Sequence, residues 1–346
     1  MGSSASREAP APVAKRTRYL PAVEAALPDL TGKIVLVTGA ARGIGLDFCK
    51  ICARKGATVV LGCRDRAKAK PAAQEIGPKA VVPEAALDLL SFASVRAFAD
   101  EVGATHEGKL THLVNNAGIM ALPPESTADG HDIQMQTNLL SPYLLTALLA
   151  PKMAPGGRVV WLSSGPGIMG IRSVFGEEAL ASGVFAPGCA TSPDVPLKPK
   201  AYWETYMCTK LGNNRLAAEF KRRASGSSLG LTTTTVNPGI TNTELQPRAV
   251  AQDSSRFMLM TVLQRFLGHS PADGAAILAH GAFVAPDGAF CEPKGPVGFS
   301  GPPHVSGDSG EQLQRSNEGK RLHLGAELDA KLWDACAKAT RATLLF

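Results

Sequence analysis

Aromatic residues and long apolar runs are both scarce in this chain. Aromatic side chains make up 5% of its 346 residues. The net charge of +6 is spread along the sequence, whereas a nucleic-acid interface needs a basic stripe with stacking aromatics. We therefore expect no nucleic-acid partner. The sequence contains no run of about 20 apolar residues and no signal-peptide core, so we expect neither a transmembrane helix nor secretion.

Paired metal ligands and regularly spaced cysteines are missing as well. The seven histidines are scattered, and none pairs at ligand spacing with another histidine or a cysteine, so no metal site is expected. The seven cysteines follow no regular pattern, which is typical of a reduced, intracellular protein. Cys49 and Cys52 form a C-x-x-C pair on a predicted helix. Because free cysteine is often buried, we expect both to pack in the core rather than to act in redox chemistry.

Hydrophobic residues, by contrast, are abundant at 45%, and from Lys33 onward short apolar runs alternate with amphipathic segments. The runs predict strands at 34–37, 58–62, 81–87, 113–114, 158–162 and 231–237. The segments predict helices at 46–52, 66–76, 91–102, 134–149 and 202–223. This alternation predicts an α/β fold, namely a Rossmann-type doubly wound parallel sheet in a three-layer α/β/α arrangement. Ligands of such a sheet bind at the carboxyl ends of its strands.

A glycine-rich turn lies between the first predicted strand and the first helix, with the sequence Thr38-Gly39-Ala40-Ala41-Arg42-Gly43-Ile44-Gly45. Its glycines let the backbone turn tightly and approach a pyrophosphate, and the helix that follows offers free N–H groups. The spacing is Gly-x-x-x-Gly-x-Gly, and strand, turn and helix together are the context of a dinucleotide site. The residues expected to contact the dinucleotide are Gly39, Ala41, Arg42, Gly43, Ile44 and Gly45.

Tyr206 and Lys210 are four residues apart on a predicted helix, so their side chains share one face. A lysine ammonium lowers the cost of ionising a neighbouring phenol, whose ordinary pKa is about 10. We therefore expect Lys210 to lower the pKa of Tyr206, so that the phenol transfers a proton near neutral pH. The spacing is common by itself, and its weight comes from the motifs upstream.

Further motifs follow the glycine turn in order, namely Asn115-Asn116-Ala117-Gly118, Asn138, Ser163-Ser164 and Pro238-Gly239. With the glycine turn and the tyrosine–lysine pair, they resemble the short-chain dehydrogenase/reductase family over residues 32–285. Cys63-Arg64-Asp65 and Leu87-Asp88-Leu89 are similar to its branch of retinol dehydrogenases and protochlorophyllide reductases. The resemblance implies reversible hydride transfer between a nicotinamide and a carbonyl/alcohol pair.

The resemblance also implies a catalytic set made of Asn138, Ser164, Tyr206 and Lys210. Tyr206 would be the general acid in reduction and the base in oxidation, and Ser164 would hydrogen-bond the same substrate oxygen. Lys210 would tune Tyr206 and hold the nicotinamide ribose. Asn138 would hold a water that links Lys210 to bulk proton exchange, or would be a structural asparagine that bends its helix.

Two neighbouring side chains compete for these roles. Ser163 directly precedes Ser164, and the family pattern favours the second serine. Tyr202 lies four residues before Tyr206, but it has no lysine four residues after it. We therefore expect Tyr202 to pack or to line the pocket.

Charge at the end of the second strand favours NADP over NAD. Members that bind NAD place an acidic residue there, whereas here Cys63 and Arg64 follow the strand. Arg64 and Arg42 suit a 2′-phosphate, because guanidinium groups bind phosphate in bidentate fashion. Asp65 is the counter-argument, and we expect it to begin the next helix.

The remaining cofactor contacts follow from the resemblance. They are Asp88, Leu89, Asn115, Ala117, Gly118, Pro238, Gly239 and Thr241, together with Tyr206 and Lys210. Asp88 would contact the adenine, with a cap on the helix at 91–102 as the alternative. Pro238, Gly239 and Thr241 would line the carboxamide side of the nicotinamide.

Residues 1–30 are rich in Ala, Pro and Ser, which predicts a disordered N-terminal tail. Two other interpretations stay open. The start, Met1-Gly2-Ser3-Ser4-Ala5-Ser6, fits an N-myristoylation pattern, and the basic residues nearby would support peripheral membrane contact through Gly2. The acid-poor composition with Arg and Ser also suits an organelle transit peptide.

Residues 31–346 are expected to form a single dinucleotide-binding oxidoreductase domain. It carries an insertion at 165–201 that borders the substrate pocket, a lid at 244–270 and a C-terminal extension at 286–346. Within the extension, the Gly- and Pro-rich segment 286–310 is expected to be a loop, and 326–340 a helix.

The function predicted from these features is an NADP-dependent oxidoreductase acting on a lipophilic carbonyl or alcohol. A light-dependent reductase of a protochlorophyllide-like tetrapyrrole uses the same tyrosine and lysine. A non-catalytic NADP-binding regulator or scaffold is the alternative of another class, although such proteins usually lose Ser, Tyr or Lys. We expect the protein to be cytoplasmic or membrane-associated unless the N-terminus targets an organelle. It would form a homo-oligomer unless the C-terminal extension blocks the pairing helices.

Overall fold

The computed structural model of the chain describes residues 17–164, 175, 177–187, 189, 199–241, 268–295, 298–308 and 325–344. Within these residues, eight strands form one sheet in the order β3-β2-β1-β4-β5-β6-β7-β8. They are β1 Ile34–Thr38, β2 Thr58–Gly62, β3 Ala80–Val81, β4 Leu110–Asn115, β5 Met153–Leu162, β6 Thr232–Val236, β7 Ala289–Pro293 and β8 Pro303–Asp308. Neighbouring strands are parallel except for β7 and β8. The strand order reverses between β1 and β4, which confirms the predicted doubly wound sheet.

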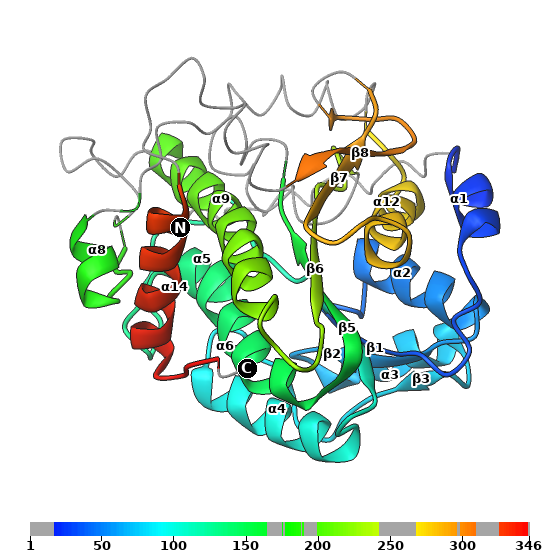
Figure 1. Ribbon diagram of the computed structural model, residues 1–346, viewed down its shortest axis with the longest axis horizontal. Coiled ribbons are helices and arrows are strands. Elements are labelled where there is room, and N and C mark those ends of the chain that lie inside the picture. Colours follow the sequence, from blue (N-terminus) through cyan, green and yellow to red (C-terminus); the bar gives the residue numbers. More distant parts are fainter. Residues whose placement is uncertain are drawn as a thin grey trace, which may run out of the picture.

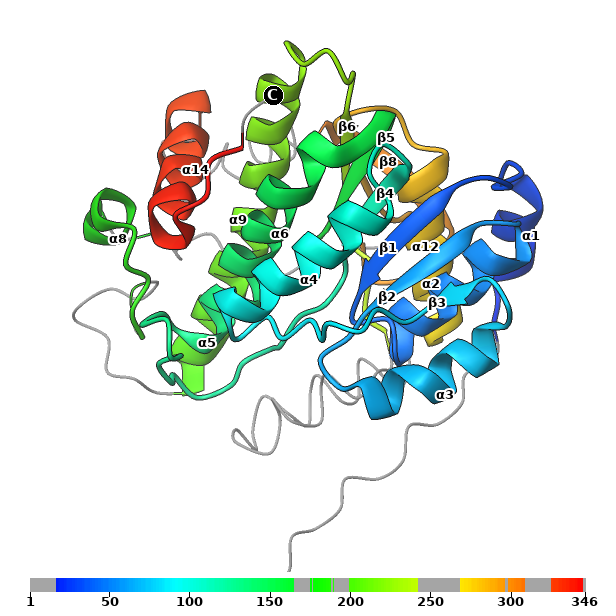
Figure 2. The ribbon, with the colours of Figure 1, turned by 90° about the horizontal axis from the view of Figure 1, so that it is seen from below.

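Helices cover both faces of this sheet (Figure 1 and Figure 2). One layer contains α4 Phe92–Thr105, α6 Ser141–Leu149 and α9 Pro199–Ala224. The opposite layer contains α2 Gly43–Arg54, α3 Arg66–Ile76 and α12 Pro271–Phe283. Helices of the same layer contact each other: α4 contacts α6 in one layer, and α2 contacts α12 in the other. The three-layer α/β/α arrangement is therefore confirmed.

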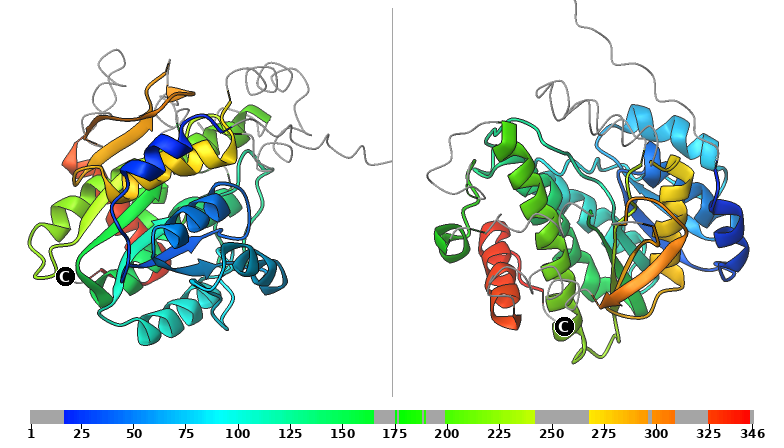
Figure 3. Two further views of the ribbon diagram at one scale, coloured as in Figure 1. Left: turned by 90° about the vertical axis from the view of Figure 1, so that its right-hand side faces the viewer. Right: turned by 90° about the horizontal axis from the view of Figure 1, so that it is seen from above.

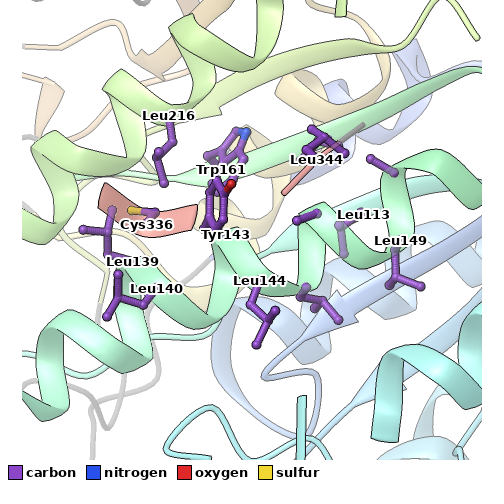
Figure 4. Close-up of a cluster of buried hydrophobic side chains, with 14 of the residues drawn as sticks. Leu113, Leu139, Leu140, Tyr143, Leu144, Leu149, Trp161, Leu216, Cys336 and Leu344 are labelled. Carbon is purple, nitrogen blue, oxygen red and sulfur yellow. The ribbon is translucent and has the colours of Figure 1, made fainter. Parts of the chain in front are cut away.

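The strands contribute to two separate apolar cores, because successive side chains point to opposite faces. In β1, Leu36 belongs to the core under α4, α6 and α9, while Val35 belongs to the core under α2 and α12. In the first core, Trp161 of β5 lies beside Tyr143 of α6 and near Leu216 of α9 (Figure 4). Continuous burial on both faces explains the unbroken apolar runs in the sequence.

The second core contains the C-x-x-C pair. Cys49 and Cys52 lie on α2 and are fully buried and free. Burial raises the pKa of the Cys52 thiol well above its ordinary value. Both side chains are packing residues, as predicted.

The C-terminal helix α14, Ala326–Thr340, has the predicted bounds. It packs on the outer side of α9 and against α8, Glu177–Ser182 (Figure 1 and Figure 3). Trp333 meets the ring of Tyr143 edge-on with centroids 4.9 Å apart. Arg215 of α9 donates to Asp329 of α14 at 2.8 Å, and both side chains are buried. α14 is therefore part of the domain core.

The expectation of a disordered tail over residues 1–30 is wrong for residues 17–30. Leu20–Ala26 form helix α1, which packs on α12, and Leu30 is buried in the second core. The buried Asp273 carboxylate accepts the backbone N–H groups of Arg18, Tyr19 and Leu20 at 2.7–3.1 Å. These N–H groups open α1, so a carboxylate distant in sequence caps the helix. Residues 1–16, including Gly2, lie outside the described part of the chain.

The expectation of a loop over 286–310 is also wrong, because this segment contains β7 and β8. Gly298 and Gly301 take positive φ values of +66° and +135° in the connection between the two strands. Pro303 begins β8, an edge strand, where a missing N–H is tolerated. The glycines and prolines therefore form the turn and the edge of a hairpin, not a long loop.

The third predicted strand is shorter than expected, since β3 ends at Val81 rather than near Leu87. Pro83 follows it and lacks the N–H that a strand ladder requires. Among the helices described, none is both long and apolar enough to cross a membrane.

Candidate active site

The glycine turn joins β1 to α2 with the expected geometry. Gly39 and Gly43 adopt φ values of +69° and +58°, which favour glycine. A Cβ on Gly45 would lie 2.5 Å from the Gly39 carbonyl oxygen, so only glycine fits there. No side chain caps the N-terminus of α2, where Arg42 is the N-cap residue with an exposed side chain. The first N–H groups of α2 can therefore bind an anionic pyrophosphate, which fits a dinucleotide.

Thr38, at the end of β1, hydrogen-bonds the loop that follows the neighbouring strand β4. Its hydroxyl accepts the backbone N–H groups of Asn116 and Ala117 at 3.0 and 2.9 Å. The Asn116 amide donates to the Thr38 carbonyl at 2.7 Å. The sequence prediction missed Thr38 and Asn116 as members of the site. Both residues stand within motifs identified from the sequence, and that position was the signal that could have found them.

The loop after β4 presents its backbone, and not the Asn115 side chain, to the turn. The Asn115 amide is buried and donates to Thr146 of α6 at 3.1 Å. Gly118 faces the interior of the site, because a Cβ there would lie 3.2 Å from Asn138 Oδ1 and 3.5 Å from Lys210 Nζ. A predicted cofactor contact by Asn115 would therefore use its main chain.

Ser164, Tyr206 and Lys210 meet where β5 ends beside α9. The Ser164 side chain hydrogen-bonds the Tyr206 phenol. The Lys210 Nζ atom lies 5.8 Å from the centroid of the Tyr206 ring and donates to the Leu162 carbonyl at 3.1 Å. Tyr206 and Lys210 are each only 5% exposed. The structure thus brings the three predicted catalytic side chains together in a place shielded from water.

Burial shifts the two titrating groups in opposite directions. It raises the pKa of Tyr206 to about 12, against a smaller lowering by the Ser164 hydrogen bond. It lowers the pKa of Lys210 to about 8. The expectation that Lys210 brings the pKa of Tyr206 below its ordinary value is therefore wrong for the protein alone. Desolvation disfavours each charged form, and it is the largest cause of both shifts.

Ser163 has a different role from Ser164. Its hydroxyl is buried and donates to the Lys210 carbonyl at 3.1 Å. This bond ties the end of β5 to the backbone of α9, whereas the Ser164 side chain hydrogen-bonds the Tyr206 phenol. The choice of Ser164 as the catalytic serine stays a prediction.

Asn138 lies in a π-helical turn, Gln136–Leu140, between a short helix, Ile133–Met135, and α6. The single long helix predicted at 134–149 is therefore interrupted. Asn138 Oδ1 accepts the Ile119 N–H at 2.8 Å, and its Nδ2 donates to the Ile119 carbonyl at 2.8 Å. Nδ2 also donates to the Thr209 hydroxyl at 3.1 Å, one residue before Lys210. π-Helical turns are frequent at functional sites, and this one joins the loop after β4 to α9.

An apolar wall adjoins the Tyr206 ring. Met120, Ala121 and Tyr206 form a small buried cluster, with Tyr202 and Trp203 packed against it. The Trp203 ring meets Tyr206 edge-on at 6.1 Å between centroids. Ala121 has a φ of +47°, which is uncommon for a side-chain-bearing residue and is found at functional sites. Tyr202 contributes to this wall, whereas Met120, Ala121 and Trp203 were not predicted.

The opposite end of the nucleotide turn is open to water. Arg64 follows β2 and is exposed, whereas Cys63 is buried near the N–H groups of Ala40 and Ala41. Asp65 is the N-cap of α3 and accepts the Lys68 N–H at 3.3 Å, as expected. Its carboxylate is thus engaged in starting the helix.

Asp88 and Leu89 lie where the chain leaves β3 for α4. The Asp88 carboxylate accepts the Leu90 N–H at 3.1 Å, and the N-cap of α4 is Ser91. The alternative that Asp88 caps this helix is therefore wrong. Leu89 is buried, and its carbonyl accepts the Ser141 hydroxyl at 2.7 Å.

The loop after β6 contains the predicted residues Pro238, Gly239 and Thr241. Gly239 has a φ of +76°, and a Cβ there would lie 2.7 Å from the Phe299 carbonyl oxygen. Thr241 is buried, and a Cβ on Gly274 would lie 2.8 Å from its hydroxyl and 3.4 Å from Ile44. Pro238 is half-buried at the start of the loop. Thr241 and Ile44, from two predicted motifs, therefore lie close together beside α12.

Most of the predicted lid and part of the insertion lie outside the described residues. The lid was expected at 244–270, of which 268–270 are described. The insertion was expected at 165–201, of which 175, 177–187, 189 and 199–201 are described.

Comparisons with known proteins relate the chain to one family of enzymes. A family model described as short chain dehydrogenase matches residues 33–175. Human retinol dehydrogenase 11 is 36% identical over 267 residues, covering 74% of each chain. Human retinol dehydrogenase 13 is 34% identical over 224 residues, covering 62% of this chain and 61% of the relative.

Solved structures show the same fold. An uncharacterized protein from Mycobacterium paratuberculosis superposes with a TM-score of 0.69 at 28% identity, covering 93% of this chain and 98% of that one. A blue fluorescent protein from a metagenomic library, solved with NADPH, has a TM-score of 0.52 at 22% identity. The superposition covers 74% of this chain and 92% of the blue fluorescent protein chain. At that identity the second likeness concerns the fold alone.

Proposed function

The chain belongs to the short-chain dehydrogenase/reductase family, in its retinol-dehydrogenase-like branch, and we propose on this premise that it is an NADP-dependent reductase of lipophilic carbonyl compounds. As a member of this family it is an oxidoreductase. The observation that carries the proposal is the convergence of Ser164, Tyr206 and Lys210 at the sheet edge that also holds the glycine turn. NADPH, when bound, supplies the hydride.

The residues of this chain would handle the proton and the substrate oxygen. Because burial raises the pKa of Tyr206 to about 12, the phenol is protonated at neutral pH and can serve as a general acid. Ser164 already hydrogen-bonds the phenol, so both hydroxyls can reach one carbonyl oxygen and stabilise charge on it. The Leu162 carbonyl holds the Lys210 ammonium, which lies 5.8 Å from the centroid of the Tyr206 ring. Asn138 anchors the loop that faces that ammonium.

NADP specificity is supported by charge at the open end of the turn. Arg64 follows β2 and Arg42 is the N-cap residue of α2, and both are exposed, so two guanidinium groups are available to bind a ribose 2′-phosphate. The nearest carboxylate, Asp65, is engaged at the N-terminus of α3. The N-terminus of α2 would hold the pyrophosphate.

A lipophilic substrate is supported by the wall beside Tyr206. Met120, Ala121, Tyr202 and Trp203 offer apolar and aromatic surface next to the phenol. Two of the relatives compared are named retinol dehydrogenases, which fits an alcohol or aldehyde on a long apolar chain.

The test is a screen of the purified protein for NADPH oxidation with aldehydes and ketones of graded lipophilicity. Activity is expected to rise with the length of the apolar chain. Tyr206→Phe is expected to lower turnover by about a thousandfold, the middle of the range for general-acid catalysis. Tyr202→Phe, a matched loss of one hydroxyl, is expected to change turnover less than about threefold. Turnover by Tyr206→Phe at the wild-type rate would refute the proposed mechanism.

A further inference from the structure

Lys210 shares its hydrogen-bond acceptor with a second side chain of α9. The Leu162 carbonyl oxygen accepts Lys210 Nζ at 3.1 Å and Asn213 Nδ2 at 2.9 Å. Tyr206, Lys210 and Asn213 stand at positions i, i+4 and i+7, so they follow one another along one face of the helix. The catalytic face of α9 therefore extends one turn beyond the tyrosine–lysine pair.

The shared carbonyl is available because the strand ladder ends beside it. β4 ends at Asn115, and the next two N–H groups, of Asn116 and Ala117, donate to the Thr38 hydroxyl. Leu162 is the last residue of β5, and its carbonyl is buried beside α9. A buried carbonyl has two lone pairs to satisfy, and here two side-chain donors satisfy them.

Besides the Ser164–Tyr206 bond, three hydrogen bonds among the described residues join the end of β5 to one stretch of α9. The third is the bond from the Ser163 hydroxyl to the Lys210 carbonyl at 3.1 Å. Ser164 follows these residues on the strand side, and Tyr206 precedes them by one turn on the helix side. The bonds therefore set the distance between the two hydroxyls that act on substrate. They also set the direction in which the Lys210 ammonium points.

We propose that Asn213 is a positioning residue of the active site, which holds the Leu162 carbonyl so that the Lys210 ammonium and the Ser164–Tyr206 pair keep their reactive geometry. This inference rests on the proposed function. Asn213 acts through Leu162 and Lys210 and does not itself touch substrate. The Leu162 carbonyl determines where the Lys210 ammonium lies. Asn213 would be a second side chain that holds this carbonyl in place, so that its position does not depend on Lys210 alone.

The neighbouring Asn214 provides a matched control. Asn213 is 2% exposed and Asn214 is 0% exposed. Both polar atoms of the Asn214 side chain lack a hydrogen-bond partner among the described residues, whereas Asn213 Nδ2 is bonded to Leu162. The same substitution at the two positions therefore has a similar packing effect, but only one of them removes the bond to the Leu162 carbonyl.

The experiment compares Asn213→Leu with Asn214→Leu in the full chain. We expect Asn213→Leu to lower kcat by about 10- to 100-fold with little change in KM for the carbonyl substrate, because displacements of about 1 Å cost that much in oriented catalysis. Asn214→Leu is expected to change kcat less than about threefold. Equal losses in the two variants would reduce Asn213 to a packing residue and overturn the proposal.

A second arm reads the effect on Lys210 without turnover. Asn213→Asp keeps the shape of the side chain but introduces a carboxylate. This carboxylate would be separated from the Lys210 ammonium by the Leu162 carbonyl oxygen. An opposite charge at that range raises a lysine pKa by about 1–3 units. NADPH binding, followed by fluorescence titration against pH, is expected to weaken above the pKa of Lys210, which is about 8 in the wild type. In Asn213→Asp this loss is expected at a pH at least about one unit higher.

An unchanged pH profile of NADPH binding in Asn213→Asp overturns the proposal, and this arm decides the matter if Asn213→Leu does not fold. Tyr206→Phe in the same assays separates this inference from the proposed function. If Tyr206→Phe turns over normally, the proposed function fails. If Tyr206→Phe is inactive while both Asn213 variants behave as wild type, only the positioning role fails.

Discussion

The two ends of the nucleotide site differ in their exposure to water. At the proposed catalytic end, Tyr206, Lys210 and Asn138 are 5%, 5% and 1% exposed and are held by several hydrogen bonds. At the end proposed to bind the ribose phosphate, Arg42 and Arg64 are exposed. Desolvation therefore controls protonation at the first end. At the second end, charges act through water and are screened by salt. Substitutions at the buried end should accordingly have larger effects.

After Tyr206→Phe, the largest effect is expected when the hydroxyl of Ser164 is removed. Ser164→Ala should lower kcat by about 10²- to 10³-fold, because it removes a donor to charge that develops on the substrate oxygen. Ser163→Ala should lower kcat by less than about tenfold and cost about 1 kcal/mol of unfolding free energy, because it removes one buried hydrogen bond. Steady-state kinetics and denaturant unfolding of both variants measure these values. A larger loss of kcat in Ser163→Ala than in Ser164→Ala would show that Ser163, and not Ser164, is the catalytic serine.

A pH dependence of stability tests burial at the same end. The pKa of Lys210 is lowered from 10.5 to about 8 by desolvation. Between these values the unfolded chain binds one more proton than the folded protein, so stability rises with pH across this window. The penalty below pH 8 amounts to about 3 kcal/mol.

The measurement compares the wild type with Lys210→Met, which cannot titrate at this position. From pH 8 to pH 10, the unfolding free energy of the wild type should rise relative to that of the variant. Above pH 10 the buried Tyr206 opposes this trend, because its pKa is raised and the unfolded phenol ionises first. A constant difference between the two proteins would show that Lys210 is hydrated in the folded state.

The smallest effect is expected at the exposed end. Arg64→Ala should weaken NADPH binding by about tenfold, equal to about 1.4 kcal/mol, and leave NADH binding nearly unchanged. The difference should shrink as salt is added, because exposed charges are screened. Arg66→Ala is the control, since Arg66 is paired with Glu84 at 2.7 Å. Fluorescence titration with NADPH and NADH measures both affinities. An undiminished preference for NADPH in Arg64→Ala would show that Arg64 does not bind the 2′-phosphate.

Much of the fold was predictable from short segments. The bounds of β2, α3 and α14 agree with the predictions, because apolar periodicity and glycine or proline breaks are local signals. The glycine turn was predictable for the same reason, since positive φ values and close backbone approach demand glycine. Errors occurred where a distant group decides the structure. Asp273 orders α1 across more than 250 residues, and β7 gives β8 its partner.

For the catalytic site, the sequence by itself determined which side chains are present and in what order. The four-residue spacing of Tyr206 and Lys210 on a helix also placed them on one face without further information. Only the tertiary structure decided their electrostatics and their supports. Burial depends on what packs around a group, so the pKa of Tyr206 is raised rather than lowered. The pairing of Lys210 and Asn213 on the Leu162 carbonyl likewise depends on where a strand ends beside a helix.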